Sequence, residues 1–152
     1  MDVLLVCSSG GHLLQLIALR DSWDRLSRVW VTDDMPDTHS VLEDERVLFA
    51  HGQTARNVKT MLRNIVLAVR TIRELRPAAV LTSGAAIAVP FAWVARAFGV
   101  PVVYVESVTR VHRPSLAARL VAPVASRVYA QWPDLVPALR GARYFGSVFS
   151  DP

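Results

Sequence analysis

Short apolar runs alternate along the chain with longer stretches in which apolar residues return at helical spacing. A short run that is apolar throughout is typical of a strand in a parallel sheet, because helices cover both faces of such a sheet. On this pattern the sequence predicts strands over Asp2–Cys7, Arg28–Thr32, Arg46–Ala50, Ala79–Thr82, Val102–Glu106, Arg127–Gln131 and Ala142–Phe145.

The stretches between these runs predict the helices. Pro90 lies inside one of them, which predicts a kink or a later helix start. We expect Asp37 or Thr38 to cap a short helical turn. The helical ranges are Leu13–Trp23, Thr38–Glu43, Arg56–Leu75, Ala85–Phe98, Pro114–Ala125 and a short Pro133–Leu139. Strands and helices alternate without a repeat or a linker, so we predict one doubly wound, parallel α/β domain over residues 1–152 and no second domain.

In such a sheet the carboxyl ends of the strands meet at one edge, where ligands bind. The clearest feature there is S-S-G-G-H at 8–12, between the first strand and the first helix. Glycines allow a ligand to approach the backbone, and the free N–H groups of a helix start face it. His12, on the first helical turn, is placed to meet a ligand hydroxyl or phosphate. The alternative is a surface histidine without a ligand role.

Several other polar residues end predicted strands at the same edge. They are Asp33, Asp34, His51, Ser83, Gly84, Glu106, Ser107, Gln131 and Trp132. Glu106 is a candidate base or acceptor of a sugar hydroxyl. Alternatively it caps the next segment or pairs with Arg110.

Two features suggest metal or thiol chemistry, and neither is expected to supply it. Asp33–Asp37 spells D-D-x-x-D, but Pro36 and the preceding strand make it a loop, so a solvated turn is favoured over a metal site. Cys7 is the only cysteine, which excludes an internal disulfide and suits a reducing compartment. Its apolar surroundings predict a buried, unreactive thiol.

The composition indicates an exposed surface that contacts a membrane or a partner. Hydrophobic residues make up 52% of the chain and charged residues 20%, with a net charge of +4. A buried sheet explains part of the apolar excess, and an apolar face for a membrane or a partner would explain the rest. The positive charge favours an anionic partner. The uncharged run Pro77–Ala95 is broken by Thr82–Gly84, so we predict no membrane span there, and Met1 leads into a strand without a secretory signal.

The helix predicted over Arg56–Leu75 is the candidate membrane surface. Its predicted core face carries Val58, Met61, Ile65, Ala68, Val69 and Ile72. The outward face carries the basic residues Arg56, Lys59, Arg63 and Arg70, flanked by Val66 and Leu67. Cations with apolar neighbours suit an anionic membrane. The alternative is an ordinary solvated helix, and nucleic acid is not favoured because the cations have no interleaved aromatics.

Several motifs occur together in an order typical of one family. They are S-S-G-G-H at 8–12, V-T-D-D at 31–34, R-N at 56–57, T-S-G-A at 82–85, Y-V-E-S-V-T-R at 104–110, Q-W-P at 131–133 and F-G-S-V-F at 145–149. The chain resembles bacterial exopolysaccharide relatives of a eukaryotic membrane-anchoring subunit. That subunit belongs to the N-acetylglucosaminyltransferase that adds the second sugar of the N-glycan lipid precursor. The resemblance covers nearly the whole chain, and E-S-x-x-R and Q-W-P are its most specific parts.

The resemblance implies a two-component, split GT-B glycosyltransferase that uses a UDP-sugar. This chain would be its N-terminal, acceptor-binding half, active only with a second subunit that holds most of the nucleotide-sugar site. The acceptor would be a polyprenyl-diphosphate-linked saccharide at the cytoplasmic face of the membrane. Eukaryotic members begin with a membrane-spanning helix and this sequence does not, so we expect peripheral attachment or attachment through the partner.

The resemblance also implies roles for individual residues. Ser9, Gly10 and Gly11 would face the diphosphates, with Ser83 and Gly84 as further substrate contacts. His12 and Glu106 are the candidate bases. Arg110 would contact the acceptor or the partner, and Gln131 and Trp132 would lie near the cleft or the subunit interface.

The implied chemistry is inversion at the anomeric carbon by direct displacement, without a metal or a cofactor. Two other functions stay open: a non-catalytic adaptor that recruits a catalytic subunit to the membrane, and a stand-alone nucleotide-binding module. Against the nucleotide-binding module, the sequence contains neither G-x-G-x-x-G nor a phosphate-loop lysine.

Overall fold

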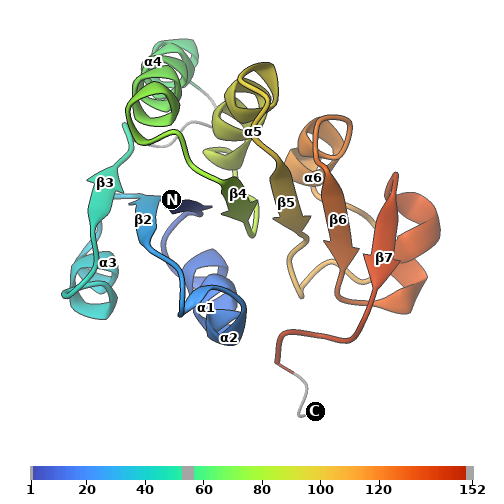
Figure 1. Cartoon of the computed structure of the whole chain (residues 1–152). Coiled ribbons are helices and arrows are strands. Elements are labelled where there is room, and N and C mark those ends of the chain that lie inside the picture. The colour runs from blue at the N-terminus through green and yellow to red at the C-terminus, as the bar shows by residue number, and fades with distance from the viewer. Residues whose placement is uncertain (1, 53–56, 150–152) are drawn as a thin grey trace.

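Seven strands form one parallel sheet in the order β3-β2-β1-β4-β5-β6-β7 (Figure 1). The computed structural model describes residues 2–52 and 57–149. The strands are β1 (Val3–Val6), β2 (Arg28–Thr32), β3 (Val47–Phe49), β4 (Ala79–Thr82), β5 (Val102–Val105), β6 (Arg127–Ala130) and β7 (Ala142–Tyr144). All seven lie within the predicted ranges, and β2 and β4 match them residue for residue. The fold class predicted from the apolar runs is therefore confirmed.

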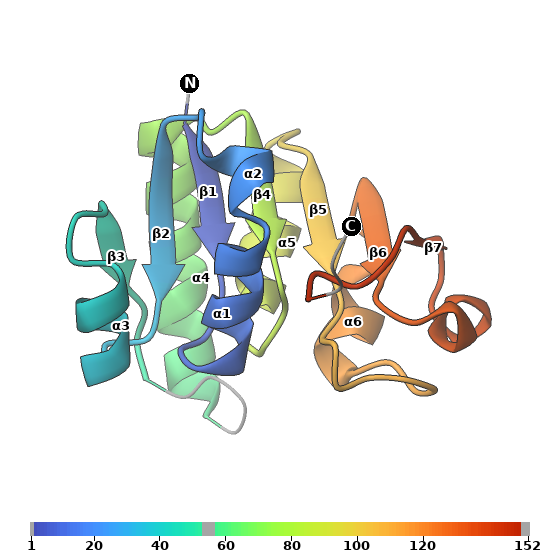
Figure 2. The same cartoon turned by 90° about the horizontal axis from the view of Figure 1, so that it is seen from below.

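Helices cover both faces of the sheet (Figures 1 and 2). On one face lie α1 (Gly11–Ala18), α2 (Arg20–Trp23) and α3 (Pro36–Val41). The other face carries α4 (Val58–Leu75), α5 (Ala88–Ala97) and α6 (Leu116–Val121). A 3₁₀ helix, η2 (Pro133–Ala138), connects β6 to β7. The chain runs from β1 outward to β3 and then returns to add β4 on the other side of β1. In sheets with such a reversal, ligands usually bind beyond the carboxyl ends of the strands on either side of it, here β1 and β4.

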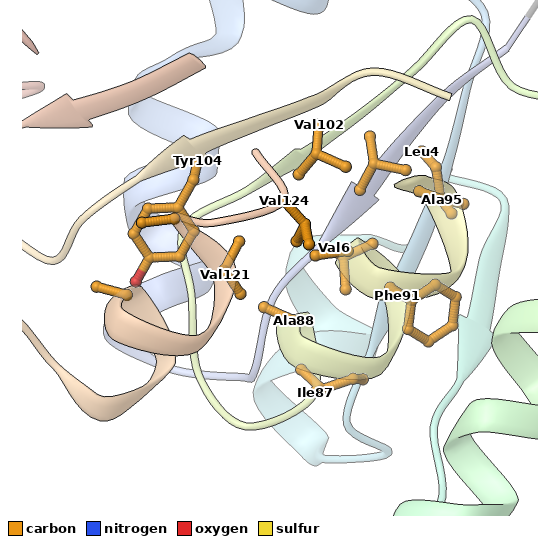
Figure 3. Close-up of a cluster of buried hydrophobic side chains, with 14 of the residues drawn as sticks. Leu4, Val6, Ile87, Ala88, Phe91, Ala95, Val102, Tyr104, Val121 and Val124 are labelled. Carbon is orange, nitrogen blue, oxygen red and sulfur yellow. The ribbon is translucent and has the colours of Figure 1, made fainter. Parts of the chain in front are cut away.

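Two apolar clusters hold the layers together, one on each face. Figure 3 shows the larger cluster, in which residues of α5 and α6 gather against residues of β1 and β5. The smaller cluster joins α1 and α2 to β1 and β2, and includes Trp23 and Trp30 with their rings edge to face, centroids 5.5 Å apart. Cys7 belongs to this cluster and is buried as predicted, and burial raises the pKa of its thiol to about 12.

The first helix differs from its prediction because it is two helices. Leu19 has φ −88° and ψ 15°, which ends α1, and α2 begins at Arg20. The break is held by side chains: the Trp23 indole donates to the Leu16 carbonyl at 2.8 Å, and the Ser22 hydroxyl donates to the Leu19 carbonyl at 2.6 Å. Helical spacing of apolar residues continues through such a break, so the pattern does not reveal it.

The start of α3 was also predicted wrongly. The helix begins with Pro36 at its first position, after Met35 in an extended conformation, and no side chain caps it. Proline suits this position because its ring fixes a helical φ and its missing N–H is not needed there. Asp37 lies inside the helix and binds the glycine loop instead.

The other helix limits follow local capping. The Asn57 side chain caps α4 by accepting from the amides of Lys59 and Thr60, so α4 begins at Val58; Arg56 lies outside the described residues. Ala85 has φ 68°, and α5 begins at Ala88 with Pro90 in its first turn, so the later start predicted from Pro90 is confirmed. Ser115 caps α6, which is shorter than the predicted Pro114–Ala125.

The predicted core face of α4 is partly wrong. Its buried residues are Asn64, Ala68, Thr71 and Ile72. Of the residues predicted to pack on the sheet, Val58, Met61 and Ile65 are exposed. The polar Asn64 is buried because its side-chain amide binds the backbone N–H and C=O of His51, at 2.9 and 3.1 Å. This contact turns the helix so that its first turns present apolar side chains outward.

Candidate functional site

His12 lies at the carboxyl edge of the sheet, beside the turn that follows β4, and two hydrogen bonds fix its position. Its ring Nδ1 lies 2.8 Å from the Ser83 carbonyl oxygen, and the Ser83 hydroxyl donates to the His12 carbonyl at 2.8 Å. Because a carbonyl oxygen only accepts, the ring proton sits on Nδ1, and in the neutral ring Nε2 keeps its lone pair. The half-buried imidazole therefore presents a proton acceptor at the carboxyl edge of the sheet.

Gly84 allows this arrangement. It has φ 107°, and a Cβ at this position would lie 2.8 Å from the Tyr104 hydroxyl and 3.5 Å from Cε1 of His12. The strand order thus brings together His12, Ser83 and Gly84, which the sequence assigned to one edge from separate strand ends.

The glycine loop differs from its prediction in one respect. The Ser9 amide donates to Oδ2 of Asp33 at 3.2 Å, and the Gly10 amide donates to Oδ2 of Asp37 at 3.1 Å. Two of the three residues predicted to face diphosphates therefore already have their N–H groups occupied by carboxylates of the same chain. Gly10 has φ 73° and stands at the N-terminus of α1, and Gly11 is its first residue.

The D-D-x-x-D segment is consequently more than a solvated turn. Asp33 and Asp37 hold the loop, and Asp34 lies 2.7 Å from Nε2 of His39. Partial burial raises the pKa of Asp33, and the nearby Asp37 raises it further, while the Ser9 amide opposes both. Within residues 2–52 and 57–149 no group of three or more His, Cys, Asp or Glu side chains is arranged to hold a metal ion.

Glu106 is fully buried and its carboxylate is engaged by neighbouring groups. Its Oε1 accepts from the Ser107 amide at 2.8 Å and from the hydroxyls of Tyr104 and Ser115 at 3.1 Å, and its Oε2 accepts from the Ser115 amide at 2.8 Å. These contacts are those expected if Glu106 caps the segment that follows β5, the alternative to a catalytic role. They join the end of β5 to the start of α6, and burial together with the charge of Glu106 raises the pKa of Tyr104.

Arg110 and Trp132 lie on the surface beside this junction. Arg110 is exposed, and the described part of the chain contains no ion pair between it and Glu106. The Trp132 indole donates to the Val108 carbonyl at 2.6 Å while its ring is 38% exposed. Both residues are thus available to a ligand or a partner.

Gln131 is buried, unlike its neighbour, and it contacts a residue that sequence reasoning missed. Its side-chain amide donates to Oε1 of Gln15 at 2.6 Å, and Gln15 also accepts from the Val108 amide at 2.8 Å. Gln15 follows His12 by three residues on α1. A single glutamine inside the apolar run L-L-Q-L-I was the available signal, but its partner is 116 residues away in sequence.

Two hollows each include a residue from the carboxyl end of a strand, Gln131 in one and His51 in the other. One, of about 320 Å³, lies on the α1–α2 side of the sheet and is lined by Leu81, Val103, Val105, Tyr129 and the segment 145–148. The other, of about 270 Å³, lies along α4 and is lined by His51, Leu62, Arg63, Val66, Leu67 and Arg70. Over the described residues, no helix is both long enough and apolar enough to span a bilayer.

Solved structures share this fold. MurG of Acinetobacter baumannii superposes with a TM-score of 0.79 at 18% identity, over 99% of this chain and 46% of its own. Anabaena Alr3699/HepE, solved in complex with UDP, gives 0.67 at 19% identity, over 97% of this chain and 44% of its own. The chain therefore spans a little under half the length of these proteins, and the likeness establishes the Rossmann-like fold of GT-B glycosyltransferases.

Sequence relatives agree on one family. UDP-N-acetylglucosamine transferase subunit ALG14 of Debaryomyces hansenii is 25% identical over 175 residues, covering 95% of this chain and 75% of that protein. The protein of the same name from Candida albicans is 24% identical over 165 residues, covering 93% and 75%. The sequence model described as "Oligosaccharide biosynthesis protein Alg14 like" matches residues 46–148. On this match the chain belongs to the Alg14-like family of oligosaccharide biosynthesis proteins.

Proposed function

We propose that the chain is the acceptor-binding, membrane-associating subunit of a two-component, inverting glycosyltransferase that uses a UDP-sugar. Residues 1–152 act as its N-terminal, acceptor-binding domain. The acceptor is a polyprenyl-diphosphate-linked saccharide in polysaccharide biosynthesis, of the exopolysaccharide type that the motifs resemble. The observation that carries the proposal is His12, whose Nδ1 is held by the Ser83 carbonyl so that Nε2 keeps its lone pair. Family membership supports it, because the relatives bear the name of a transferase subunit.

His12 is the general base of the proposed reaction. Nε2 takes the proton of the acceptor hydroxyl as its oxygen bonds to the anomeric carbon of the donor. The bond from that carbon to the nucleotide diphosphate breaks, and the diphosphate leaves with the electron pair. The hydrogen bond from Nδ1 to the Ser83 carbonyl orients the ring and stabilises the imidazolium that forms. Glu106, whose carboxylate is engaged at Ser107 and Ser115, positions the loop that carries Arg110.

The leaving diphosphate is assigned to the partner subunit. The amides of Ser9 and Gly10 are occupied by Asp33 and Asp37, and these carboxylates add negative charge beside the loop. An anionic nucleotide is better received by positive groups and free amides on a second chain. The saccharide then binds to this chain at the carboxyl edge of the sheet, where it contacts Gly11, Ser83 and Gly84.

The partner subunit covers the apolar hollow beside the segment 145–149. Phe145 is 79% exposed and Phe149 55%, and Phe145 lines the hollow together with sheet residues such as Val103 and Tyr129. Trp132 and Arg110 lie on the rim of the same edge. Large exposed aromatic side chains beside a hollow are typical anchors of protein interfaces.

The membrane contact is assigned to α4. Its first turns expose Val58, Leu62 and Val66, and the cations Lys59, Arg63 and Arg70 are exposed beside them. Apolar side chains flanked by cations favour an anionic bilayer surface. Because helices of a parallel sheet begin at its carboxyl edge, this surface and His12 lie toward the same end of the molecule. We assign the cytoplasmic face, which suits the single reduced Cys7.

A reconstituted complex tests the catalytic role. The chain is co-expressed with the polypeptide encoded by the neighbouring short reading frame, and transfer of labelled sugar from UDP-sugars to polyprenyl-diphosphate-linked acceptor is measured. His12→Gln is expected to lower turnover by about 10²- to 10⁴-fold with complex formation unchanged. His39→Gln, the same change at an exposed histidine, is expected to leave turnover unchanged. Full turnover in His12→Gln would favour the non-catalytic adaptor.

A further inference from the structure

Gln131 joins three separate segments through one buried side-chain amide. Its Nε2 donates to Oε1 of Gln15 at 2.6 Å and to the Glu106 carbonyl at 2.9 Å. Its Oε1 accepts from the Ser147 hydroxyl at 3.1 Å and the Val148 amide at 3.0 Å. The side chain is 1% exposed.

These contacts use the full capacity of the group. A primary amide has two N–H donors and two acceptor positions, and all four are occupied here. Rotation of the amide would leave buried donors facing donors, at a cost of about 1–3 kcal/mol for each unpaired group. The orientation of Gln131 is therefore unique, and a displacement of any one segment is transmitted to the others.

The three segments have distinct places in the site. Gln15 lies on α1, one turn beyond His12. Glu106 and Val108, the latter bound to Gln15, begin the loop that carries Arg110. Ser147 and Val148 belong to the segment 145–149, which lines the apolar hollow.

We propose that Gln131, with Gln15, is a positioning pair that couples the segment 145–149 to the helix that carries His12. The inference rests on the proposed function, in which the partner subunit docks on that segment. Docking of the partner holds Ser147 and Val148 in position, and their hydrogen bonds hold the Gln131 amide. Gln131 in turn holds Gln15, and with it the helix that positions the ring of His12. The pair gives the partner subunit a second role, the positioning of His12, beside binding the nucleotide diphosphate.

The first experiment uses the isolated chain and the ring resonances of its histidines by NMR. Gln131→Met keeps the length of the side chain and removes all four hydrogen bonds. We expect it to shift the His12 ring resonances while those of His39, on the opposite side of the glycine loop, stay in place. An unshifted His12 in a folded Gln131→Met chain would overturn the proposal, whatever the partner does.

A matched pair of variants at Gln15 separates positioning from general damage. Gln15→Glu keeps an acceptor oxygen for the Gln131 side chain and the Val108 amide, whereas Gln15→Met removes it. In the reconstituted complex we expect Gln15→Met and Gln131→Met each to lower kcat at least tenfold, with KM and partner affinity changed less than threefold. Gln15→Glu should retain kcat within about threefold, and the double Met variant should be no worse than either single one.

The outcomes distinguish this inference from the proposed function. If kcat survives in Gln131→Met, or if the two losses multiply, the coupling is overturned although the transferase assignment stands. If the wild-type complex transfers no sugar while His12 still responds to Gln131→Met, the proposed function fails and the positioning of His12 by Gln131 stands.

Discussion

Gly84 packs between the Tyr104 hydroxyl and the ring of His12. Its missing side chain leaves room for the Tyr104 hydroxyl on one side and the His12 ring on the other, and its φ of 107° is one that side-chain-bearing residues rarely adopt. The sequence identified Gly84 only as part of a turn. The steric reason could not be predicted, because Tyr104 follows 20 residues later on another strand.

A pair of glycine variants tests this steric role. We expect Gly84→Ala to lower the free energy of unfolding in urea by about 2–3 kcal/mol, from backbone strain and the clash with Tyr104. Gly99→Ala is the control, because its φ of 73° is also positive but a Cβ there meets nothing within 4 Å. This variant should therefore lose only the part of the unfolding free energy that comes from backbone strain. Equal losses in the two variants would contradict the steric explanation.

The acidic residues beside the glycine loop show a second limit of sequence reasoning at this scale. D-D-x-x-D suggests metal ligands or a solvated turn, and both views treat the segment by itself. In the structure Asp33 and Asp37 serve a loop 24 and 27 residues earlier in the chain. Such a role depends on how β1 and β2 place their ends together, which local spacing does not encode.

At the scale of elements, α4 shows what periodicity predicts and what it misses. Its length and its basic stripe were predicted, and Ala68 and Ile72 are buried as expected. The rotation about its axis was not predicted, because the contact between Asn64 and His51 decides which apolar residues face the sheet. The consequence is an apolar surface next to the cations rather than opposite them.

Vesicle binding tests this surface. The three described cations Lys59, Arg63 and Arg70 contribute about 3 kcal/mol at an anionic surface, about a hundredfold in affinity. We expect the chain to cosediment with vesicles rich in anionic lipid, and Leu62→Asp with Val66→Asp to reduce that binding at least tenfold. Added salt should weaken the wild-type binding, because it screens the cations.

The control for this test is Val41→Asp on α3. Val41 is an exposed apolar residue, 46% accessible, on the opposite face of the sheet. This variant should bind vesicles like the wild type. Equal loss in both variants would contradict a specific role for α4.

At the scale of the whole molecule, the sequence predicted the sheet and the edge at which its strands end. Buried parallel strands are apolar throughout, so the strands are visible without knowledge of their neighbours, and topology then places their carboxyl ends together. The network around Gln131 was not predicted, because it depends on the distances between α1, the β5–α6 loop and the segment 145–149. The family resemblance places Gln131 near a cleft or an interface; its side chain is buried, and it is one of the residues that line the hollow of about 320 Å³.

The partner interface can be tested at Phe145. Its ring lies 5.9 Å from that of Tyr129 and is mostly exposed beside the apolar hollow. We expect Phe145→Asp to weaken association with the second subunit at least thirtyfold, the scale of an interface anchor, without changing the thermal midpoint of the isolated chain. Phe98→Asp, at an exposed phenylalanine after α5, should leave association intact. Loss in both variants would point to a general effect of the charge.

The central place of β1 has a consequence for how the chain folds. In the order of the chain β1 comes before the other strands of the sheet, and it pairs with the next strand, β2, with Val3 beside Arg28. Its other neighbour is β4, with Val3 beside Ala79, so that edge of an entirely apolar strand stays unpaired until β4 has been synthesised. A nascent chain that ends before β4 therefore exposes the strand that will carry the glycine loop. The last step that protects this strand from aggregation is also the step that brings Ser83 and Gly84 to His12.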